Sequence, residues 1–181
     1  MNIMNFETLS QWRRSAFCAA MAQRNINHVL LFSDMCEQDP KPFSKLLSKT
    51  WAFLQGELKS VDNLERFFNE FDQWQNTLLA DHDSFGAEAA QQACQSLYSA
   101  SYGLLDDGAN DCELVQLSNQ QLLTEFAEFG NDSDELIERH NEFEKTVFEL
   151  LTSGKPKRET IIAVQKLADS EEESSLGISL T

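Results

Sequence analysis

The chain has 181 residues, of which 41% are apolar and 24% charged, and its formal net charge is −16. This composition excludes an intrinsically disordered chain, and the length allows one hydrophobic core to form without disulfides or metals. Seven Gly and three Pro are few for a protein with many tight turns, which favours helices over a β-sandwich or barrel.

Apolar residues recur at three- and four-residue steps along nearly the whole chain, which is typical of amphipathic helices. The first helix is expected to begin after Asn5, a suitable N-cap, and to end near Arg24. A short second helix is expected over residues 26–37. Pro42 suits the first turn of a third helix, which ends at Gly56.

The fourth and fifth helices are expected to have contrasting surfaces. The fourth carries a broad stripe of large apolar side chains that must pack against other helices: Leu64, Phe67, Phe68, Phe71, Trp74 and Leu78. The fifth follows Asp83 or Ser84 as a cap and has mostly small residues from Gly86 to Ser101. Because small side chains let neighbouring helices approach closely, we expect the fifth helix to be central.

Three further helices are expected in the second half of the chain. A turn at 106–111 precedes a sixth helix from Cys112 to Phe129. The seventh helix opens with Asp132-x-x-Glu135, which resembles a capping box, and it ends at Gly154. Pro156 starts the eighth helix.

An acidic run and an apolar tail, residues 171–181, follow the eighth helix. Leu176, Ile178 and Leu180 alternate with small residues, so an extended conformation would point all three side chains to one side. We expect the tail to lie in a groove on this domain or on a second copy, a frayed terminus being the alternative. The predicted fold is all-α: a single domain over 1–181, formed by a bundle of seven or eight helices with a short extended C-terminal tail.

Acidic residues are concentrated in the middle of the chain. No Lys or Arg occurs from Phe67 to Glu138, whereas fifteen Asp and Glu do. Such a surface repels phosphate backbones and anionic lipids, so neither nucleic acid nor a membrane is an expected partner. No segment of the sequence is apolar enough to span a bilayer, and residues 1–5 do not resemble a signal peptide, so we expect a cytoplasmic protein.

The cysteines and histidines lack the spacing of metal or redox sites. The sequence has no Cys-x-x-Cys, His-x-x-x-His or Glu-x-x-His. His82, in the loop from Asp81 to Ser84, is interpreted as part of a solvated capping loop. His140 falls on the apolar stripe of the seventh helix and is expected to be partly buried and hydrogen-bonded. We expect reduced, buried thiols at Cys18, Cys36, Cys94 and Cys112.

Motifs of catalysis are also absent from the sequence. It has no glycine-rich phosphate loop and no Gly-x-Ser-x-Gly, and residues 106–111 do not keep the register of a calcium loop. The many carboxylates offer pairs for acid–base chemistry without singling one out. Trp12 and Trp51 could line a ligand pocket, but tryptophan at helical spacing is more often part of a core. We therefore predict no catalytic, cofactor-binding or metal-binding residues and no cofactor.

A family resemblance extends over nearly the whole chain. The residues that carry it are Leu9-x-x-Trp12, Phe17-Cys18, Arg24, Phe32, Trp51, Phe85-Gly86, Ala93-Cys94-x-x-Leu97, Ser118 and Ser175-Leu176-Gly177-Ile178. In these positions the chain resembles the YjaG-like bacterial proteins, a domain of unknown function numbered 416. The resemblance rests on packing residues and implies a compact all-helical protein. It implies no activity, because the family has no assigned catalytic residues.

Two hypotheses of function remain open, and a third ranks below them. The missing catalytic motifs, the small-residue helix and the apolar tail favour a non-enzymatic protein that binds other proteins, as a homodimer or with another partner. The alternative is a small-molecule ligand-binding protein or enzyme with a site between helices. An acidic mimic of nucleic acid would need charges spaced like phosphates, and a sequence does not show such spacing.

Overall fold

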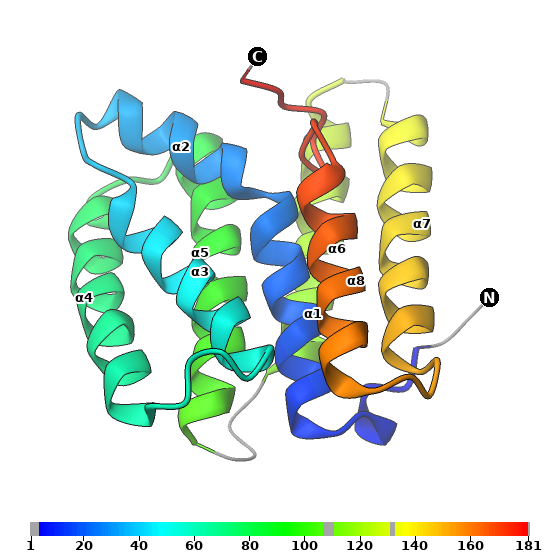
Figure 1. Cartoon of the computed structure of the whole chain (residues 1–181). Helices are drawn as coiled ribbons and strands as arrows, with labels where there is room; N and C mark the ends of the chain where they lie inside the picture. The colour runs from blue at the N-terminus through cyan, green and yellow to red at the C-terminus, as the bar shows by residue number, and fades with distance from the viewer. Residues whose placement is uncertain (1–3, 107–110, 131–132, 181) are drawn as a thin grey trace.

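The computed structural model describes residues 4–106, 111–130 and 133–180. Within these ranges the protein has eight α-helices, one short 3₁₀-helix and no strand, so the all-α prediction is confirmed (Figure 1). In chain order the elements are η1 (Phe6–Thr8), α1 (Gln11–Arg24), α2 (Ile26–Met35), α3 (Lys41–Leu54), α4 (Val61–Leu79), α5 (Phe85–Leu105), α6 (Cys112–Glu128), α7 (Asp134–Leu151) and α8 (Lys157–Ser170).

Seven helices lie roughly side by side, and α2 crosses one end of the bundle (Figure 1). Helices α1, α4, α6 and α8 run toward that end, whereas α3, α5 and α7 run away from it. We call it the α2 end. It consists of α2, the start of α5, the end of α6, the start of α7 and residues 171–180. The opposite end holds η1, the start of α1 and the loops at 55–60 and 152–156.

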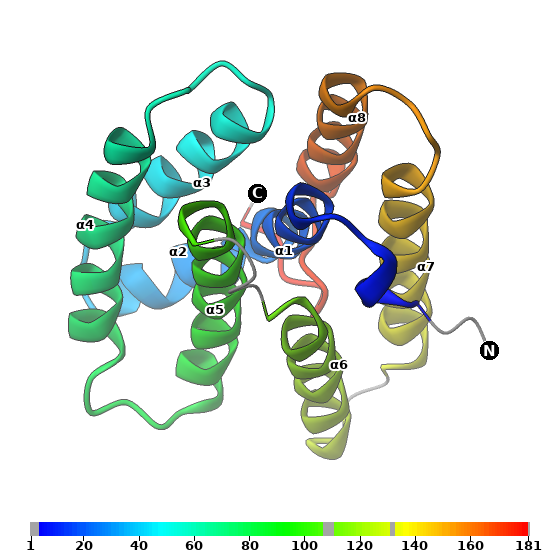
Figure 2. The same cartoon turned by 90° about the horizontal axis from the view of Figure 1, so that it is seen from below.

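The centre of the bundle is α1, with α5 packed along it (Figure 2). Every residue from Ser15 to Ala22 is fully buried, at 0% exposure, and most of these side chains are small. The small face of α5 is buried beside it, including Ala93, Cys94 and Ala100. The prediction that α5 is central is confirmed, since α5 contacts α1, α2, α3, α4 and α6. Helix α1 shares the centre, because its small side chains over two turns let other helices pack closely around it.

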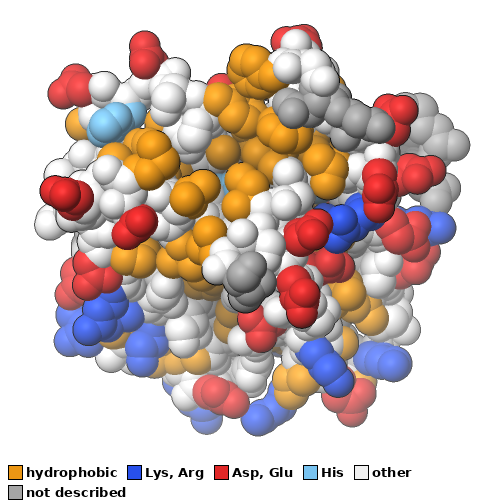
Figure 3. Space-filling model, turned by 90° about the horizontal axis from the view of Figure 1, so that it is seen from above, with side chains coloured by type: hydrophobic (Ala, Val, Ile, Leu, Met, Phe, Trp, Pro, Cys, Tyr) orange, Lys and Arg blue, Asp and Glu red, His pale blue; other side chains and the backbone are white. Residues whose placement is uncertain are grey.

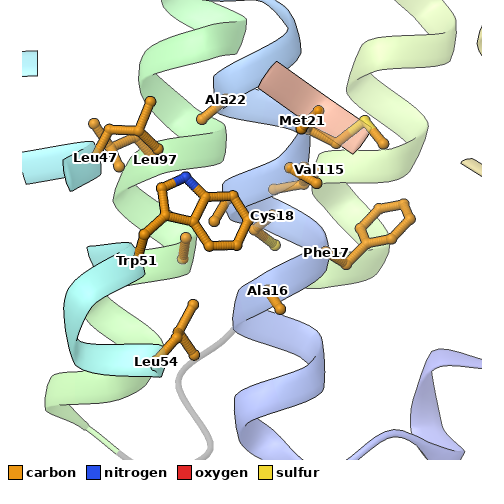
Figure 4. Close-up of a cluster of buried hydrophobic side chains, with 14 of the residues drawn as sticks. Ala16, Phe17, Cys18, Met21, Ala22, Leu47, Trp51, Leu54, Leu97 and Val115 are labelled. Carbon is orange, nitrogen blue, oxygen red and sulfur yellow. The ribbon is translucent and has the colours of Figure 1, made fainter. Parts of the chain in front are cut away.

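The packing around α1 accounts for the aromatic residues of α3 and α4. Trp51 of α3 lies between α1 and α5, close to Ala22, Leu54 and Leu97 (Figure 4). It is 2% exposed, and its Nε1 donates to Gln23 Oε1 at 3.3 Å, so its core assignment is confirmed.

The apolar stripe of α4 also packs inward. Phe71 is fully buried, and its ring centre lies 6.0 Å from that of Phe43 in α3. Phe68 is buried against Tyr98 and Tyr102 of α5.

The ends of the helices follow local chemistry, with one departure from prediction. Asn5 Oδ1 accepts a hydrogen bond from Glu7 N at 3.1 Å and so caps only the 3₁₀ turn η1. The backbone then becomes extended at Leu9, and α1 starts at Gln11, so the first helix is shorter than expected. Ser84 caps α5 as predicted, accepting from Ala87 N at 3.2 Å. Asp132 of the expected capping box and most of the 106–111 turn lie outside the described residues.

Candidate functional site

The tail is held on the α2 end by a buried polar network. Asn25, at the corner between α1 and α2, accepts a hydrogen bond from Ser175 N at 2.9 Å. Its Nδ2 donates to Asn119 Oδ1 of α6 at 3.0 Å, and Asn119 in turn donates to Ser96 Oγ of α5 at 3.3 Å. All four residues are buried. The network therefore ties the tail to three helices, and the expected docking occurs on this domain.

A second set of hydrogen bonds fixes the tail through the hydroxyl group of Ser174. Ser174 Oγ accepts from Leu176 N and Ile178 N at 3.3 and 3.2 Å and lies 2.7 Å from His28 Nε2 of α2. With both lone pairs occupied, the hydroxyl donates its proton to the imidazole. Burial lowers the pKa of His28 to about 4, which agrees with a neutral ring that accepts this hydrogen bond.

The apolar side chains of the tail do not point the same way, contrary to the alternation predicted. Leu176 is 4% exposed and packs with Ala89, Leu122 and Leu123, whereas Leu180 is 48% exposed. Gly177 has a φ of +76°, in the left-handed region where a side chain is strained, and the backbone turns there. The turn leaves Leu180 at the surface.

Large apolar side chains gather on the exposed surface of the α2 end (Figure 3). We call this the apolar face. Met35 and Phe129 are 72% and 66% exposed, and Leu31 and Leu180 are also exposed. Phe85 is half-buried and its ring lies 5.1 Å from that of Phe129. With half-buried Ile178, which packs on the same cluster as Phe85, the apolar face consists of Leu31, Met35, Phe85, Phe129, Ile178 and Leu180.

Acidic side chains border the apolar face, and Lys and Arg lie toward the margins of the same view (Figure 3). The segments 25–40, 67–138 and 167–180, from which the α2 end is largely built, contain no Lys or Arg. Arg139 of α7 lies just beyond them and pairs with Glu173 of the tail at 3.0 Å. The apolar face and the acidic residues beside it therefore come from segments without Lys or Arg, although segment 67–138 also carries acidic residues at the opposite end, among them Asp111 and Glu113.

Two of these carboxyl groups lie together beside the aromatic rings. Glu88 is one turn along α5 from Phe85, and Glu125 directly precedes Phe126 in α6. A hydrogen bond with Glu125 raises the pKa of Glu88, and desolvation and the charge of Glu125 add to this effect. Two ionised carboxylates within hydrogen-bonding reach repel each other, so the contact between Glu88 and Glu125 is favourable only while one of them keeps a proton.

The histidine and tryptophan side chains that the sequence singled out do not come together in one site. His82 is exposed and lies 3.8 Å from Cys36 Sγ at the α2 end, where its ring also meets the edge of Phe32. Trp12 is half-buried under the cations of Arg13 and Lys157 rather than in a pocket. Among the described residues no group of three or more His, Cys, Asp or Glu could hold a metal ion.

Three of the four cysteines are fully buried, as expected, and Cys36 is half-buried. Burial raises the pKa of the Cys94 and Cys112 thiols, so both remain protonated and unreactive at neutral pH. These residues therefore pack as small apolar side chains.

His140 is buried and hydrogen-bonded in α7, as expected, but its partner Glu144 was not foreseen. His140 Nε2 lies 2.5 Å from Glu144 Oε1, and both residues are at most 1% exposed. Glu144 Oε2 also accepts from Gln116 and Gln120 of α6 at 2.9 and 3.3 Å. These side chains lie along a groove of about 670 Å³ between α6 and α7, whose rim includes Lys145. The i, i+4 spacing of His140 and Glu144 was the available signal.

Arg24, in the last turn of α1, is a buried cation. It is 3% exposed, its guanidinium stacks on the Phe143 ring at 4.5 Å, and burial lowers its pKa. No described residue accepts a hydrogen bond from its Nε or Nη1, and none is within reach of His140 Nδ1. Such atoms are not confined to this region, because Ser175 Oγ of the tail is also buried without a hydrogen-bond partner among the residues that the structure describes.

No helix among the described residues is long and apolar enough to cross a membrane. A family model described as a protein of unknown function (DUF416) matches residues 3–179. The chain belongs to this family. The match spans the positions that carried the resemblance, from Leu9 to Ile178, so that prediction is confirmed.

Two similar proteins align with this chain over nearly their whole lengths. An uncharacterized protein from Haemophilus influenzae is 26% identical over 188 residues, which cover 95% of this chain and 93% of the relative. The crystal structure of a DUF416 family protein from Shewanella baltica superposes with a TM-score of 0.77 at 20% identity, covering 97% of this chain and 96% of that one. At this identity the likeness establishes the single-domain all-α fold and nothing about activity.

Proposed function

We propose that the protein works by binding another protein through the apolar face at the α2 end. The observation that carries the proposal is the exposure of Met35 and Phe129, at 72% and 66%, the two most exposed large apolar side chains among the described residues. Large side chains of this kind, gathered on one surface, are typical of interaction sites. No catalytic constellation accompanies them in the described residues, which favours a binding role over an enzymatic one.

The charge of this end favours a different protein over a second copy. In a symmetric dimer the same patch occurs on both subunits, so each acidic border would meet its own image. Like charges across an interface cost several kcal/mol, on the order of what a small apolar patch returns. The same charge repels nucleic acids and anionic lipids, which leaves another polypeptide as the proposed partner of a cytoplasmic protein.

A test replaces the two most exposed residues of the face with serine, as Met35→Ser/Phe129→Ser. The matched control is Val61→Ser/Ile162→Ser, two residues at 46% and 45% exposure outside the apolar face. Chemical cross-linking of each variant in its native cell extract should give the same partner band for the wild type and the control, and lose it for the face variant. Equal cross-linking of the wild type, the control and the face variant would contradict the proposal. So would a cross-linked band at twice the mass of the chain that disappears only in the face variant, because it would indicate a homodimer.

A second candidate function is small-molecule binding in the groove between α6 and α7. The observation that favours it is the buried pair of His140 and Glu144 beside a groove with polar walls. Native mass spectrometry of protein purified without a tag tests it. A co-purifying small molecule that is lost in Gln116→Leu/Gln120→Leu would support ligand binding, whereas bare protein mass throughout would oppose it.

A further inference from the structure

The proposed protein-binding function leaves the chemistry of the partner open, and the charge pattern of the α2 end limits it. We infer that the apolar face binds an amphipathic helix whose apolar side is flanked by Lys or Arg. The inference rests on the proposed function and adds the class of partner. Its basis is the combination of an apolar centre with a border made from segments that contain no basic residue.

The apolar face has the features of a helix-binding surface. Leu31 and Met35 are one turn apart on α2, so they present a single ridge. The rings of Phe85 and Phe129 form a second apolar group, and the tail residues Ile178 and Leu180 supply further apolar surface at the same end. Helices that bind apolar surfaces insert residues spaced by three, four and seven positions, which reach separated apolar groups of this kind. Met35 adds an adaptable side chain.

The acidic border defines what the flanks of that helix carry. Asp34 and Glu37 lie beside Met35, and Glu88 and Glu125 lie beside the Phe85 ring. A cation placed between Glu88 and Glu125 would relieve the repulsion between these carboxyl groups, a gain that a neutral partner cannot offer. Complementary charge of this kind also accelerates association and rejects acidic partners.

The same arrangement excludes an acidic helix as the partner of this surface. An acidic amphipathic helix would meet carboxylates along the border and no Lys or Arg from residues 25–40 or 67–138. A basic segment without an apolar side would leave Met35 and Phe129 exposed to water. The partner therefore needs both features at once, which makes the inference testable with defined peptides.

The experiment measures binding of three synthetic peptides of about five helical turns to the full chain. The first has leucines on one helical side and lysines on the other, the second replaces lysine by glutamate, and the third has the composition of the first in scrambled order. Protein variants are Glu88→Gln/Glu125→Gln and the charge-matched control Glu65→Gln/Glu70→Gln, both exposed residues of α4. Titration calorimetry at low and at about 0.5 M salt gives the affinities.

We expect binding of the lysine peptide, weaker binding of the scrambled one and none of the glutamate peptide. The Glu88/Glu125 variant should bind the lysine peptide about five- to tenfold more weakly than the control variant, with the difference much reduced at high salt. Equal affinity for ordered and scrambled peptides, or equal loss in both variants, would overturn the inference by showing nonspecific attraction. If Met35→Ser/Phe129→Ser loses the cellular partner while the lysine peptide does not bind, the proposed function stands and this inference fails.

Discussion

Phe6 and Phe129 each lie next to a helix end, at opposite ends of the same bundle. Phe6 is 2% exposed and meets the rings of Phe17 and Phe148 at 4.8 and 6.0 Å, whereas Phe129 is 66% exposed. The charged residues differ in the same way. At the opposite end Arg14 pairs with Glu113 at 2.9 Å and Arg13 donates to the Leu151 carbonyl, but at the α2 end Glu88 faces Glu125. Phe6 is covered by side chains of its own domain, whereas Phe129 is left largely in contact with water.

The comparison is tested most strongly by removing the two rings in turn. Phe6→Ala should lower the free energy of unfolding by about 3–5 kcal/mol, because it empties a buried aromatic site. Phe129→Ala should lower it by less than about 1 kcal/mol, because most of that ring is already in water. Urea unfolding of both variants measures the difference. Comparable losses would mean that Phe129 belongs to the core and that the two ends do not differ.

The next largest effect is expected at the network that closes the centre of the α2 end. Asn25→Ala leaves Ser175 N and Asn119 Oδ1 buried without a partner, so we expect a loss of about 2–4 kcal/mol. Asn27→Ala is the matched control, since half-buried Asn27 also holds the tail, through a 2.9 Å hydrogen bond to Ile178 O. It should cost about 1 kcal/mol. Hydrogen exchange should show faster exchange at 174–178 in the Asn25 variant, and unchanged exchange there would contradict this role.

Acid should weaken the α2 end before the opposite end. The pKa of His28 is lowered to about 4 in the folded protein, whereas an unfolded histidine titrates near 6.5. Between these values the unfolded chain binds a proton that the folded chain does not, so stability present above pH 6.5 is lost as pH falls toward 4. The loss should be about 2–3 kcal/mol, measured by denaturant midpoints across this range.

His28→Gln should flatten that part of the pH profile, because glutamine keeps an acceptor for Ser174 and binds no proton. His82→Gln is the control, since His82 is exposed, and it should keep the wild-type slope. An unchanged slope in His28→Gln would assign the pH dependence to other groups.

The smallest effects should have opposite signs at the two ends. Glu113→Gln removes the partner of Arg14, whose side chain is 18% exposed, and should destabilise by at most about 1 kcal/mol at pH 7. Glu88→Gln removes repulsion from Glu125 and should leave stability unchanged or raise it by a few tenths of a kcal/mol. Melting temperatures at low salt measure both. A clear loss for Glu88→Gln would show that its carboxylate has a stabilising partner.

The helices were predictable where local chemistry and packing agree. The stripe of α4, including Phe71, could be assigned to the core because its spacing fits one helical face. Ser84 could be named as a cap because its side chain acts on the next turn. The split between η1 and α1 could not be foreseen, because Leu9 leaves the helical conformation while its side chain still fits the apolar spacing of the first helix.

The candidate site was less predictable because it depends on contacts between distant segments. Glu144 is buried only because Gln116 and Gln120 reach it from another helix, and sequence spacing does not show depth. The tail was expected to dock, but the turn at Gly177 changed which of its side chains are covered. The apolar face was not predicted at all. Leu31 fits a helical stripe as well as Phe32 does, and only the position of α2 decides which of them faces solvent.

The hydrogen bond from Ser175 to Asn25 joins positions that are 150 residues apart in the chain. During translation the corner between α1 and α2 leaves the ribosome long before its partner is made, at about 5–20 residues per second. Until residue 175 is made, the Asn25 side chain lacks this partner, and once α5 and α6 are made, Ala89, Leu122 and Leu123 lack the cover of Leu176. Closing so long a loop is also entropically costly, so docking of the tail is expected to be a late step in folding. Early stages of synthesis therefore present a wider apolar surface at the α2 end than the finished protein does.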